Sequence, residues 1–373
     1  MFPIKRYLQD IDTPQVVVFK EILLQNIRDM QKFADESNVK LRPHIKSHKI
    51  PEIAKIQIDE GARGITVSKL GEAQAMINSG VDDVFIAYEI VGETKINRLI
   101  ELTRKARVCV AVDSLENASE LNRAFAAKGL TLDVLLEIDV GLKRCGVKPS
   151  QDAIQLAKQI TKLPNLNLKG IFTHAGQVYG ALSYDEVVEI GRKEGETMVN
   201  LAKQMKKEGI ELKEISVGST PTAKISGKVK GITEIRPGNY VFYDAIQMGL
   251  GIVSARACSL RVVSTVISIP AKNRAVIDAG SKTLALDKGA HGVSVVSGFG
   301  YIRGYESLTI TRLSEEHGII EGTSTKDLLH IGHRIEIIPN HACPVINLTD
   351  EVAVIDGGEV KGFWKVLGRG KSK

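Results

Sequence analysis

A short basic segment, RPHIKSHK at residues 42–49, carries several residues that could do chemistry on one side of an extended chain. On a β-strand, the two-residue period places Arg42, His44, Lys46 and His48 on one face. A solvated surface loop would produce the same run of charges. At the end of a buried strand, however, desolvation and neighbouring cations lower the pKa of a lysine amine and make it nucleophilic. Lys46 is therefore a candidate for forming a Schiff base with a carbonyl compound.

Two later segments contain groups that bind phosphate. GSTPT at 218–222 offers backbone N–H groups, hydroxyls and the N-terminus of a following helix, which together suit a dianion. RPGNY at 236–240 places a glycine where the backbone must approach a ligand closely. The alternative for the first segment is an ordinary helix N-cap, which requires no ligand.

These segments follow runs of apolar residues that are typical of buried parallel strands. Strands are expected at 38–45, 63–67, 84–88, 107–112, 132–138, 168–173, 213–217 and 232–236. Amphipathic helical patterns alternate with them, as at 18–37 and 185–209. Eight strand–helix units in about 220 residues predict a (β/α)8 barrel of the TIM type. A doubly wound open sheet is the alternative, but no GxGxxG turn follows the first predicted strand.

A barrel of this kind holds its catalytic groups at the C-terminal ends of its strands. Lys46 follows the first predicted strand, and the two phosphate-binding segments follow the seventh and eighth. Phosphate sites recur at these two positions of the fold. Lys46 facing these two phosphate-binding segments predicts pyridoxal 5′-phosphate as the cofactor.

From about residue 250 the pattern changes to short, alternating segments separated by turns, which predicts an all-β domain. We expect a barrel domain that binds pyridoxal phosphate over 20–250 and a β domain over 251–373. Residues 1–19 could join the β domain, because the apolar run QVVVF at 15–19 precedes the barrel pattern.

Composition excludes several classes of protein. The 50 basic and 44 acidic residues among 373 give a net charge of only +6, and the basic groups lack the flanking aromatic residues of a base-stacking surface. No apolar stretch is long enough for a membrane span, and the four cysteines have no CxxC spacing. We expect a cytoplasmic protein that binds neither nucleic acid nor membrane and acts on a small molecule.

Six motifs, in this order along the chain, carry a resemblance to a known family. They are DTP at 12–14, RPHIKSHK at 42–49, GLKRCGV at 141–147, THAGQVYG at 173–180, SVGSTPT at 216–222 and EIRPGNYVFYD at 234–244. The set resembles the D-threonine aldolase and D-serine dehydratase family of fold-type III pyridoxal-phosphate enzymes, which are related to alanine racemase. The resemblance implies that Lys46 binds the cofactor, that Arg144 lies beside its phenolic oxygen, and that His174 and Tyr179 line its face. It also implies that the phosphate end is surrounded by Gly218, Ser219, Thr220, Gly238, Asn239 and Tyr240.

A candidate metal site lies in the β domain, in PNHACP at 339–344. On an extended segment, His341 and Cys343 point the same way and can bind one ion. A structural role for both is the alternative, but the segment resembles the family's metal-binding segment, in which a histidine pairs with aspartate or cysteine. A thiolate favours zinc, whereas a carboxylate would favour manganese or magnesium. The resemblance associates aspartate with the aldolases and cysteine with the dehydratases, so Cys343 departs from the aldolase pattern.

These features predict a lyase, dependent on pyridoxal phosphate and a divalent metal, that acts on β-hydroxy-D-amino acids. Our first expectation is retro-aldol cleavage of D-threonine-like substrates to glycine and an aldehyde, with His48 or a metal-bound water as the base for the β-hydroxyl. The alternative is a zinc-dependent D-serine or D-threonine dehydratase, in which Lys46 takes the Cα proton.

Other activities of the same fold are weaker alternatives. An amino-acid racemase would need a second base, for which Tyr301 and Tyr305 are candidates. A non-catalytic pyridoxal-phosphate-binding protein would normally lack the β domain, and a phosphate-binding barrel without cofactor would leave Lys46 unexplained. Related two-domain barrels pair head to tail, so we expect a homodimer.

Overall fold

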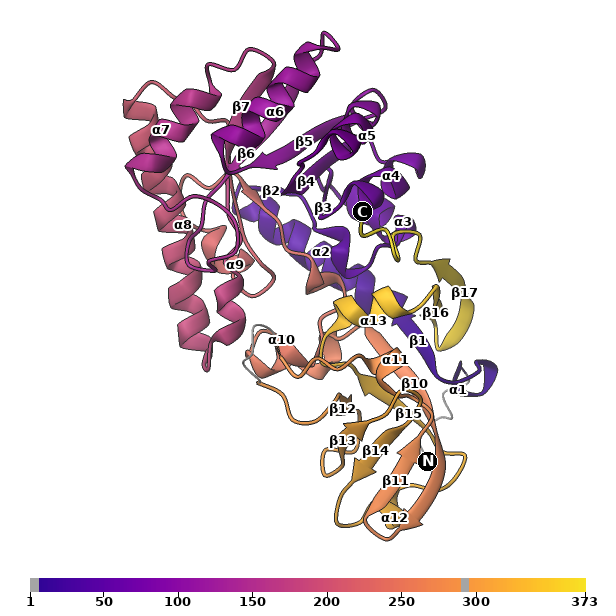
Figure 1. Ribbon diagram of the computed structural model, residues 1–373. Coiled ribbons are helices and arrows are strands. Elements are labelled where there is room, and N and C mark those ends of the chain that lie inside the picture. The colour runs from indigo at the N-terminus through magenta and orange to yellow at the C-terminus, as the bar shows by residue number, and fades with distance from the viewer. Residues whose placement is uncertain (1–6, 290–294) are drawn as a thin grey trace.

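The computed structural model describes residues 7–289 and 295–373 and contains a barrel followed by a β domain (Figure 1). The barrel strands are β2 (Lys40–Leu41), β3 (Ile65–Val67), β4 (Asp83–Glu89), β5 (Arg107–Val112), β6 (Leu132–Glu137), β7 (Leu166–Phe172), β8 (Glu214–Val217) and β9 (Glu234–Ile235). They form one parallel sheet in the order β2-β9-β8-β7-β6-β5-β4-β3. A parallel bridge between His44 and Thr66 joins the two ends of this sheet. The sheet therefore closes, and the predicted (β/α)8 barrel is confirmed.

Helices on the outside of the barrel cover its strands (Figure 1). They are α2 (Lys20–Glu36), α3 (Pro51–Asp59), α4 (Leu70–Asn78), α5 (Glu93–Thr103), α6 (Leu115–Ala126), α7 (Gln151–Ile160), α8 (Tyr184–Lys207) and the short α9 (Ala223–Ser226). Helix α7 illustrates why they form: the Ser150 hydroxyl caps its first turn, and Ile154 and Ile160 recur on its buried face. Burying each isoleucine contributes about 1.5–3 kcal/mol to folding.

The second sheet contains β1 (Gln15–Phe19) together with strands from the C-terminal part of the chain. These are β10 (Leu260–Ala271), β11 (Arg274–Ile277), β12 (Tyr301–Ile302), β13 (Thr309–Leu313), β14 (Gly318–Glu321), β15 (Arg334–Ile338), β16 (Glu351–Asp356) and β17 (Glu359–Lys365). Strand β1 pairs antiparallel with β10 and parallel with β16, so the N-terminal segment is built into this sheet. Residues 1–6 of the range expected to join it lie outside the described residues.

Short helices interrupt the β domain, which is therefore not purely β. They are α11 (Ser281–Leu284), α12 (Thr325–Leu328) and α13 (Ala342–Leu348), while α10 (Ala245–Gly249) lies between β9 and β10 and α1 (Tyr7–Asp10) precedes β1. None of the helices in the described part of the chain is long and apolar enough to cross a membrane.

Helix α13 lies where the barrel meets the β domain (Figure 1). The Lys49 ammonium donates to Asn347 Oδ1 at 2.7 Å, and the N–H of Gly368 donates to the Lys49 carbonyl at 3.0 Å. The N–H of Ala245 donates to the Pro339 carbonyl at 3.0 Å, just before α13. The Lys49–Asn347 bond joins α13 to the segment that contains Lys46, and the Ala245–Pro339 bond joins the residues before α13 to the end of the barrel.

Candidate active site

A cavity of about 430 Å³ opens between the C-terminal ends of the barrel strands and α13. The structure brings most of the predicted site residues together there. Those that line it are Lys46, Arg144, His174, Tyr179, Ser219, Thr220, Gly238, Asn239, His341 and Cys343. Residues from both domains therefore contribute to a single site.

Lys46 lies on a 3₁₀ turn (Ile45–Ser47) directly after the first barrel strand. The side chain of His44 caps this turn, because its Nδ1 accepts a bond from the Lys46 N–H at 3.3 Å. Burial lowers the pKa of the Lys46 ammonium, and the positive charges of Arg144 and Arg236 act in the same direction, against Cys343. A lowered pKa favours the free amine, which is the nucleophilic form that a Schiff base requires.

His48 does not reach this cavity. The 3₁₀ turn interrupts the strand, so the expectation that Lys46 and His48 share one face is wrong. The His48 ring is fully buried, where its Nδ1 accepts from the Ile50 N–H at 3.1 Å and its Nε2 bonds Gln57 Oε1 at 3.2 Å. Burial lowers the pKa of His48 to about 3. We therefore withdraw His48 as the base for a substrate hydroxyl.

The phosphate-binding segments form two adjoining walls of the cavity. Gly218 adopts a φ of +101°, which favours glycine, and turns the chain so that Ser219 and Thr220 line the cavity. A Cβ on Gly238 would lie 2.7 Å from the His44 carbonyl oxygen, so only glycine fits there. In the described part of the chain, we find no backbone acceptor for the N–H groups of Thr220, Gly238 and Asn239. These donors and the neighbouring hydroxyls fit a phosphate group.

Tyr240 contributes to this wall through its backbone rather than its side chain. Its N–H donates to Thr220 Oγ1 at 3.2 Å, which holds the two phosphate-binding segments together. Its phenol points into the core and accepts a bond from Gln57 Nε2 at 2.9 Å. The tyrosine ring does not line the cavity.

Arg236 lines the cavity and was not among the predicted site residues. It is buried at the end of β9, bonds Ser216 Oγ and the Thr173 carbonyl, and lies over the Phe172 ring at 5.1 Å. Because Arg236 stands at the end of a predicted barrel strand, the sequence could have identified it as a site residue. Asp244, Gln247 and Asp287 also line the cavity and were missed.

Arg144 lies at the rim of the cavity, beside a pair of acidic side chains. Its guanidinium is 3.5 Å from Glu137 Oε1. Burial and the neighbouring Glu89 carboxyl raise the pKa of Glu137 to about 8. Two adjacent carboxyl groups cannot both ionise readily, so a proton is retained beside Arg144 at neutral pH.

His341 and Cys343 lie at the start of α13 rather than on the extended segment that was expected. His341 is still extended and precedes the helix, and Cys343 is the second helical residue. Pro344 is compatible with this start, because the first turn of a helix needs no N–H bond. Both side chains nevertheless line the same cavity as Lys46.

The electrostatics of this pair are those of a thiolate beside an imidazolium, and a bound metal would take the place of the imidazolium proton. Burial disfavours the Cys343 thiolate, but His341 and a bond to Ser47 outweigh it and lower the pKa of the thiol. Burial opposes the charged His341 ring, but Cys343 and Asp287 outweigh it and raise the pKa of His341 well above its ordinary value. Imidazole and thiolate are ligands that zinc prefers.

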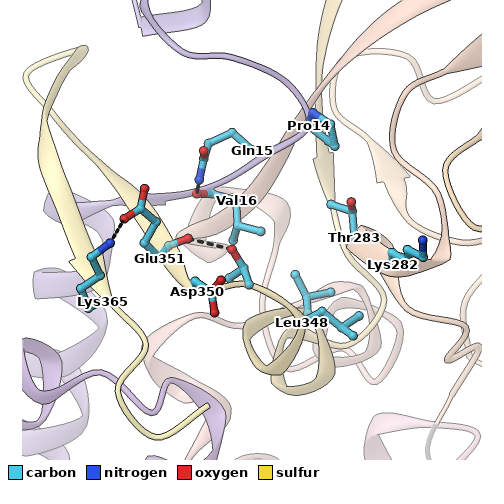
Figure 2. A pocket seen from close by; sticks show the side chains of 11 residues that line it. Pro14, Gln15, Val16, Lys282, Thr283, Leu348, Asp350, Glu351 and Lys365 are labelled. Atoms are coloured by element: carbon cyan, nitrogen blue, oxygen red, sulfur yellow. Dashed lines mark hydrogen bonds and ion pairs between the residues drawn. The ribbon is translucent and has the colours of Figure 1, made fainter. Parts of the chain in front are cut away.

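A second hollow, between β1, α11, α13 and β16, contains none of the predicted site residues (Figure 2). Its charged groups are paired with one another or with neighbours: Glu351 with Lys365, Asp350 with Arg369 at 3.2 Å, and Lys282 with Glu316 at 2.6 Å. We therefore assign the site to the cavity around Lys46.

Comparison with known proteins agrees with this assignment. The family model described as alanine racemase, N-terminal domain, matches residues 20–245, and that of a putative serine dehydratase domain matches residues 259–355. A D-threonine aldolase from Arthrobacter is 33% identical over 98% of this chain and 95% of its own.

Solved structures extend the similarity to the whole fold. A D-threonine aldolase from Filomicrobium marinum superposes with a TM-score of 0.91 at 31% identity, covering 98% of this chain and 97% of the other. A cysteine-to-alanine variant of D-threo-3-hydroxyaspartate dehydratase, in a metal-free form, superposes with a TM-score of 0.90 at 28% identity. The superposition covers 96% of this chain and 98% of the other. The chain belongs to the alanine racemase-like, fold-type III family of pyridoxal-phosphate enzymes, among the lyases that carry a serine dehydratase domain.

Proposed function

We propose that the chain is a lyase, dependent on pyridoxal 5′-phosphate and a divalent metal, that acts on β-hydroxy-D-amino acids. The observation that carries the proposal is the meeting of Lys46, a phosphate cradle and the His341–Cys343 pair in one cavity. Cys343 Sγ lies 3.3 Å from the hydroxyl of Ser47, the residue after Lys46. A substrate with its α-amine at Lys46 would therefore have its β-hydroxyl near the metal pair.

The residues of the barrel would hold the cofactor. Lys46 would bind it covalently, and the phosphate end would lie against Gly218, Ser219, Thr220, Gly238, Asn239 and the Tyr240 backbone. Arg144 is proposed beside the phenolic oxygen, with His174 and Tyr179 at the ring. When bound, the cofactor supplies an electron sink for negative charge that develops at Cα. Lys46, displaced as a free amine, can then accept or return a proton there.

His341 and Cys343 would hold the metal. Zinc is favoured because one donor is a thiolate, and manganese or magnesium are the alternatives. Such an ion supplies Lewis acidity toward an oxygen of the substrate. Among the described residues, no third histidine, cysteine or acidic ligand atom completes a cluster with these two within 4.8 Å. Open coordination positions suit a catalytic rather than a structural ion.

Retro-aldol cleavage is the reaction we place first. It requires a base for the β-hydroxyl proton, and the withdrawal of His48 leaves that role open. Asp287 lines the cavity and lies 3.9 Å from His341 Nδ1. The neighbouring His341 ring lowers the pKa of Asp287, which keeps the carboxylate ionised and able to accept a proton, as a weaker base than a carboxylate of ordinary pKa. D-Threonine-like substrates would yield glycine and an aldehyde, as the similarity to D-threonine aldolases supports.

Dehydration is the second candidate, and Cys343 is the observation that favours it. The sequence resemblance associates a cysteine with dehydratases, and a dehydratase of similar fold is known as a cysteine-to-alanine variant in a metal-free form. In this reaction Lys46 would take the Cα proton, and the hydroxyl would leave from Cβ. The racemase alternative has less support, because the Tyr305 hydroxyl bonds His333 at 3.2 Å and lines a different hollow.

Product analysis tests the proposal. The purified protein, supplied with pyridoxal phosphate and zinc or manganese, is incubated with D-threonine, D-serine or L-threonine, with and without a chelator. Glycine and acetaldehyde from D-threonine support the aldolase, and 2-oxobutanoate with ammonia supports the dehydratase. L-Threonine turnover equal to that of D-threonine, or interconversion of D- and L-alanine as the main reaction, would contradict the proposal.

We make two further proposals, which concern the location of the protein and its assembly. We propose a cytoplasmic location and a homodimeric assembly. Cell fractionation and light scattering of the purified protein test them.

A further inference from the structure

A buried carboxyl group lies behind the phosphate-binding segment. Glu194, on α8, is only 1% exposed. Its Oε1 accepts a hydrogen bond from the Gly218 N–H at 2.8 Å. Gly218 is the residue whose positive φ turns the chain into the cavity wall. The carboxyl therefore holds the first residue of that wall from outside the cavity.

Two glycines let α8 come close enough for this contact. A Cβ on Gly191 would lie 3.0 Å from Ile225 side-chain atoms, and one on Gly195 would lie 2.6 Å from Val229 Cγ2. Helix α8 thus packs against α9 and the loop after it with its backbone nearly in contact. Glu194 lies between the two glycines, so its side chain points at the segment that precedes α9.

Packing alone does not account for a glutamate at this position. Its Oε2 has no hydrogen-bond partner among the described residues. Burial raises the pKa of Glu194, against the opposing effects of the Gly218 N–H, the nearby Thr222 and Ser226 hydroxyls and the charge of Arg236. An apolar side chain would fill the same space without the cost of desolvating a carboxyl group. The bond to Gly218 is the backbone interaction that only an acceptor at this position can make.

We propose that Glu194 is a positioning residue for the phosphate end of the cofactor. By holding the Gly218 N–H away from the cavity, it fixes the turn after which Ser219 and Thr220 face inward. Ser219 is in turn held by Thr222, whose Oγ1 accepts its N–H at 3.1 Å. This inference rests on the proposed function, because it requires a phosphate-bearing cofactor in the cavity.

The test compares two cofactors that differ only in the phosphate. Full-length protein, freed of cofactor, is titrated with pyridoxal 5′-phosphate and with pyridoxal, and binding is followed by absorbance. Glu194→Leu should weaken pyridoxal-phosphate binding by at least about tenfold and leave pyridoxal binding unchanged, since only the phosphate contacts the displaced segment. Glu194→Gln keeps an oxygen acceptor and should bind both compounds like the unaltered protein.

The controls separate positioning from general damage. Glu214→Leu removes another buried glutamate, which pairs with Arg63 at the opposite end of β8 at 2.6 Å, and should leave the ratio of the two affinities unchanged. If Glu194→Leu does not fold, Glu194→Asp makes the same test, because the shorter side chain withdraws the acceptor. Equal weakening of both cofactors, or no weakening, would contradict the positioning role. An unaltered protein that binds neither compound would contradict the proposed function, and with it this role.

Discussion

Cys343 Sγ in the β domain and Ser47 Oγ in the barrel lie 3.3 Å apart, within hydrogen-bonding distance. Ser47 follows Lys46 on the same 3₁₀ turn, so the proposed metal segment touches the turn that holds the proposed cofactor lysine. The two functional segments are almost 300 residues apart in the chain, and each follows a strand of a different sheet. The site exists only where the two domains meet.

The metal pair should be separable from the cofactor. We expect the double variant His341→Ala/Cys343→Ala to contain no bound divalent ion, because both donors are removed. Its cofactor absorbance should persist, and turnover should fall by roughly 100-fold or more, since a metal supplies several kcal/mol of charge stabilisation. Metal analysis and visible spectra measure these outcomes. The control is His317→Ala/Cys109→Ala, which removes the same residue types elsewhere. Unchanged metal content in the first variant would mean that the pair is structural.

Changing one ligand should change the preferred ion. Cys343→Asp replaces a soft thiolate by a hard carboxylate, which favours manganese or magnesium over zinc. We expect metal-depleted variant protein to recover more activity with manganese than with zinc, and the unaltered protein to show the opposite order. Activity titrations with each ion measure this preference. The same order in both proteins would argue against Cys343 as a ligand.

His48 should make the fold sensitive to acid. Its pKa is about 3 in the folded protein and about 6.5 in an unfolded chain, so the unfolded state binds more protons between these values. Stability from the neutral ring is therefore fully present above pH 6.5 and is lost as the pH falls. This group alone should lower the free energy of unfolding by about 2 kcal/mol between pH 7 and pH 5.

Urea unfolding at several pH values tests this expectation. His48→Asn keeps an acceptor for the Ile50 N–H but cannot take up a proton, so its stability should vary less with pH than that of the unaltered protein. His317→Asn, at an exposed position, is the control. An identical pH dependence in His48→Asn and the unaltered protein would contradict the buried neutral ring.

Gly238 should tolerate no side chain. In Gly238→Ala the new Cβ would meet the His44 carbonyl oxygen at 2.7 Å, so the turn that holds Lys46 must shift. Overpacking of this kind costs about 1–3 kcal/mol, and we expect pyridoxal-phosphate affinity to fall about tenfold or more. Gly318→Ala makes a similar clash, at 2.8 Å from the Ala279 carbonyl oxygen, but inside the β domain. Cofactor titration should therefore show weaker binding of pyridoxal phosphate to Gly238→Ala than to Gly318→Ala. Equal affinities of the two variants would contradict the proposed phosphate-binding site.

The barrel could be predicted from the sequence because its strands are continuous apolar runs between amphipathic helices. The run DVLLEI, for example, contains most of β6 (Leu132–Glu137). The first strand was harder, since it ends at Leu41 and a 3₁₀ turn follows at Ile45. Side chains alternate between two faces in a strand but repeat about every three residues in a 3₁₀ turn. The alternation expected of a strand therefore did not predict which side chains share a face there. Arg42, expected beside Lys46, instead pairs with Glu234 at 2.9 Å.

Within the site, the motifs identified residues that meet in space but not how each contributes. Tyr240 contributes to the phosphate-binding wall through its backbone N–H. A pattern of side chains in the sequence cannot reveal such a role. Asp287 comes from a part of the β domain where no predicted motif lay, and only the tertiary fold brings it to His341. Arg236 could have been found, because it directly follows a predicted barrel strand.

The central claim is that Lys46 binds pyridoxal phosphate covalently, and chemical trapping tests it most directly. The protein loaded with cofactor is reduced with borohydride, digested and sequenced by mass spectrometry. We predict a pyridoxyl phosphate adduct on Lys46, and none in Lys46→Ala, while the surface variant Lys40→Ala retains it. An adduct on another lysine, or no adduct in the unaltered protein, would contradict the account.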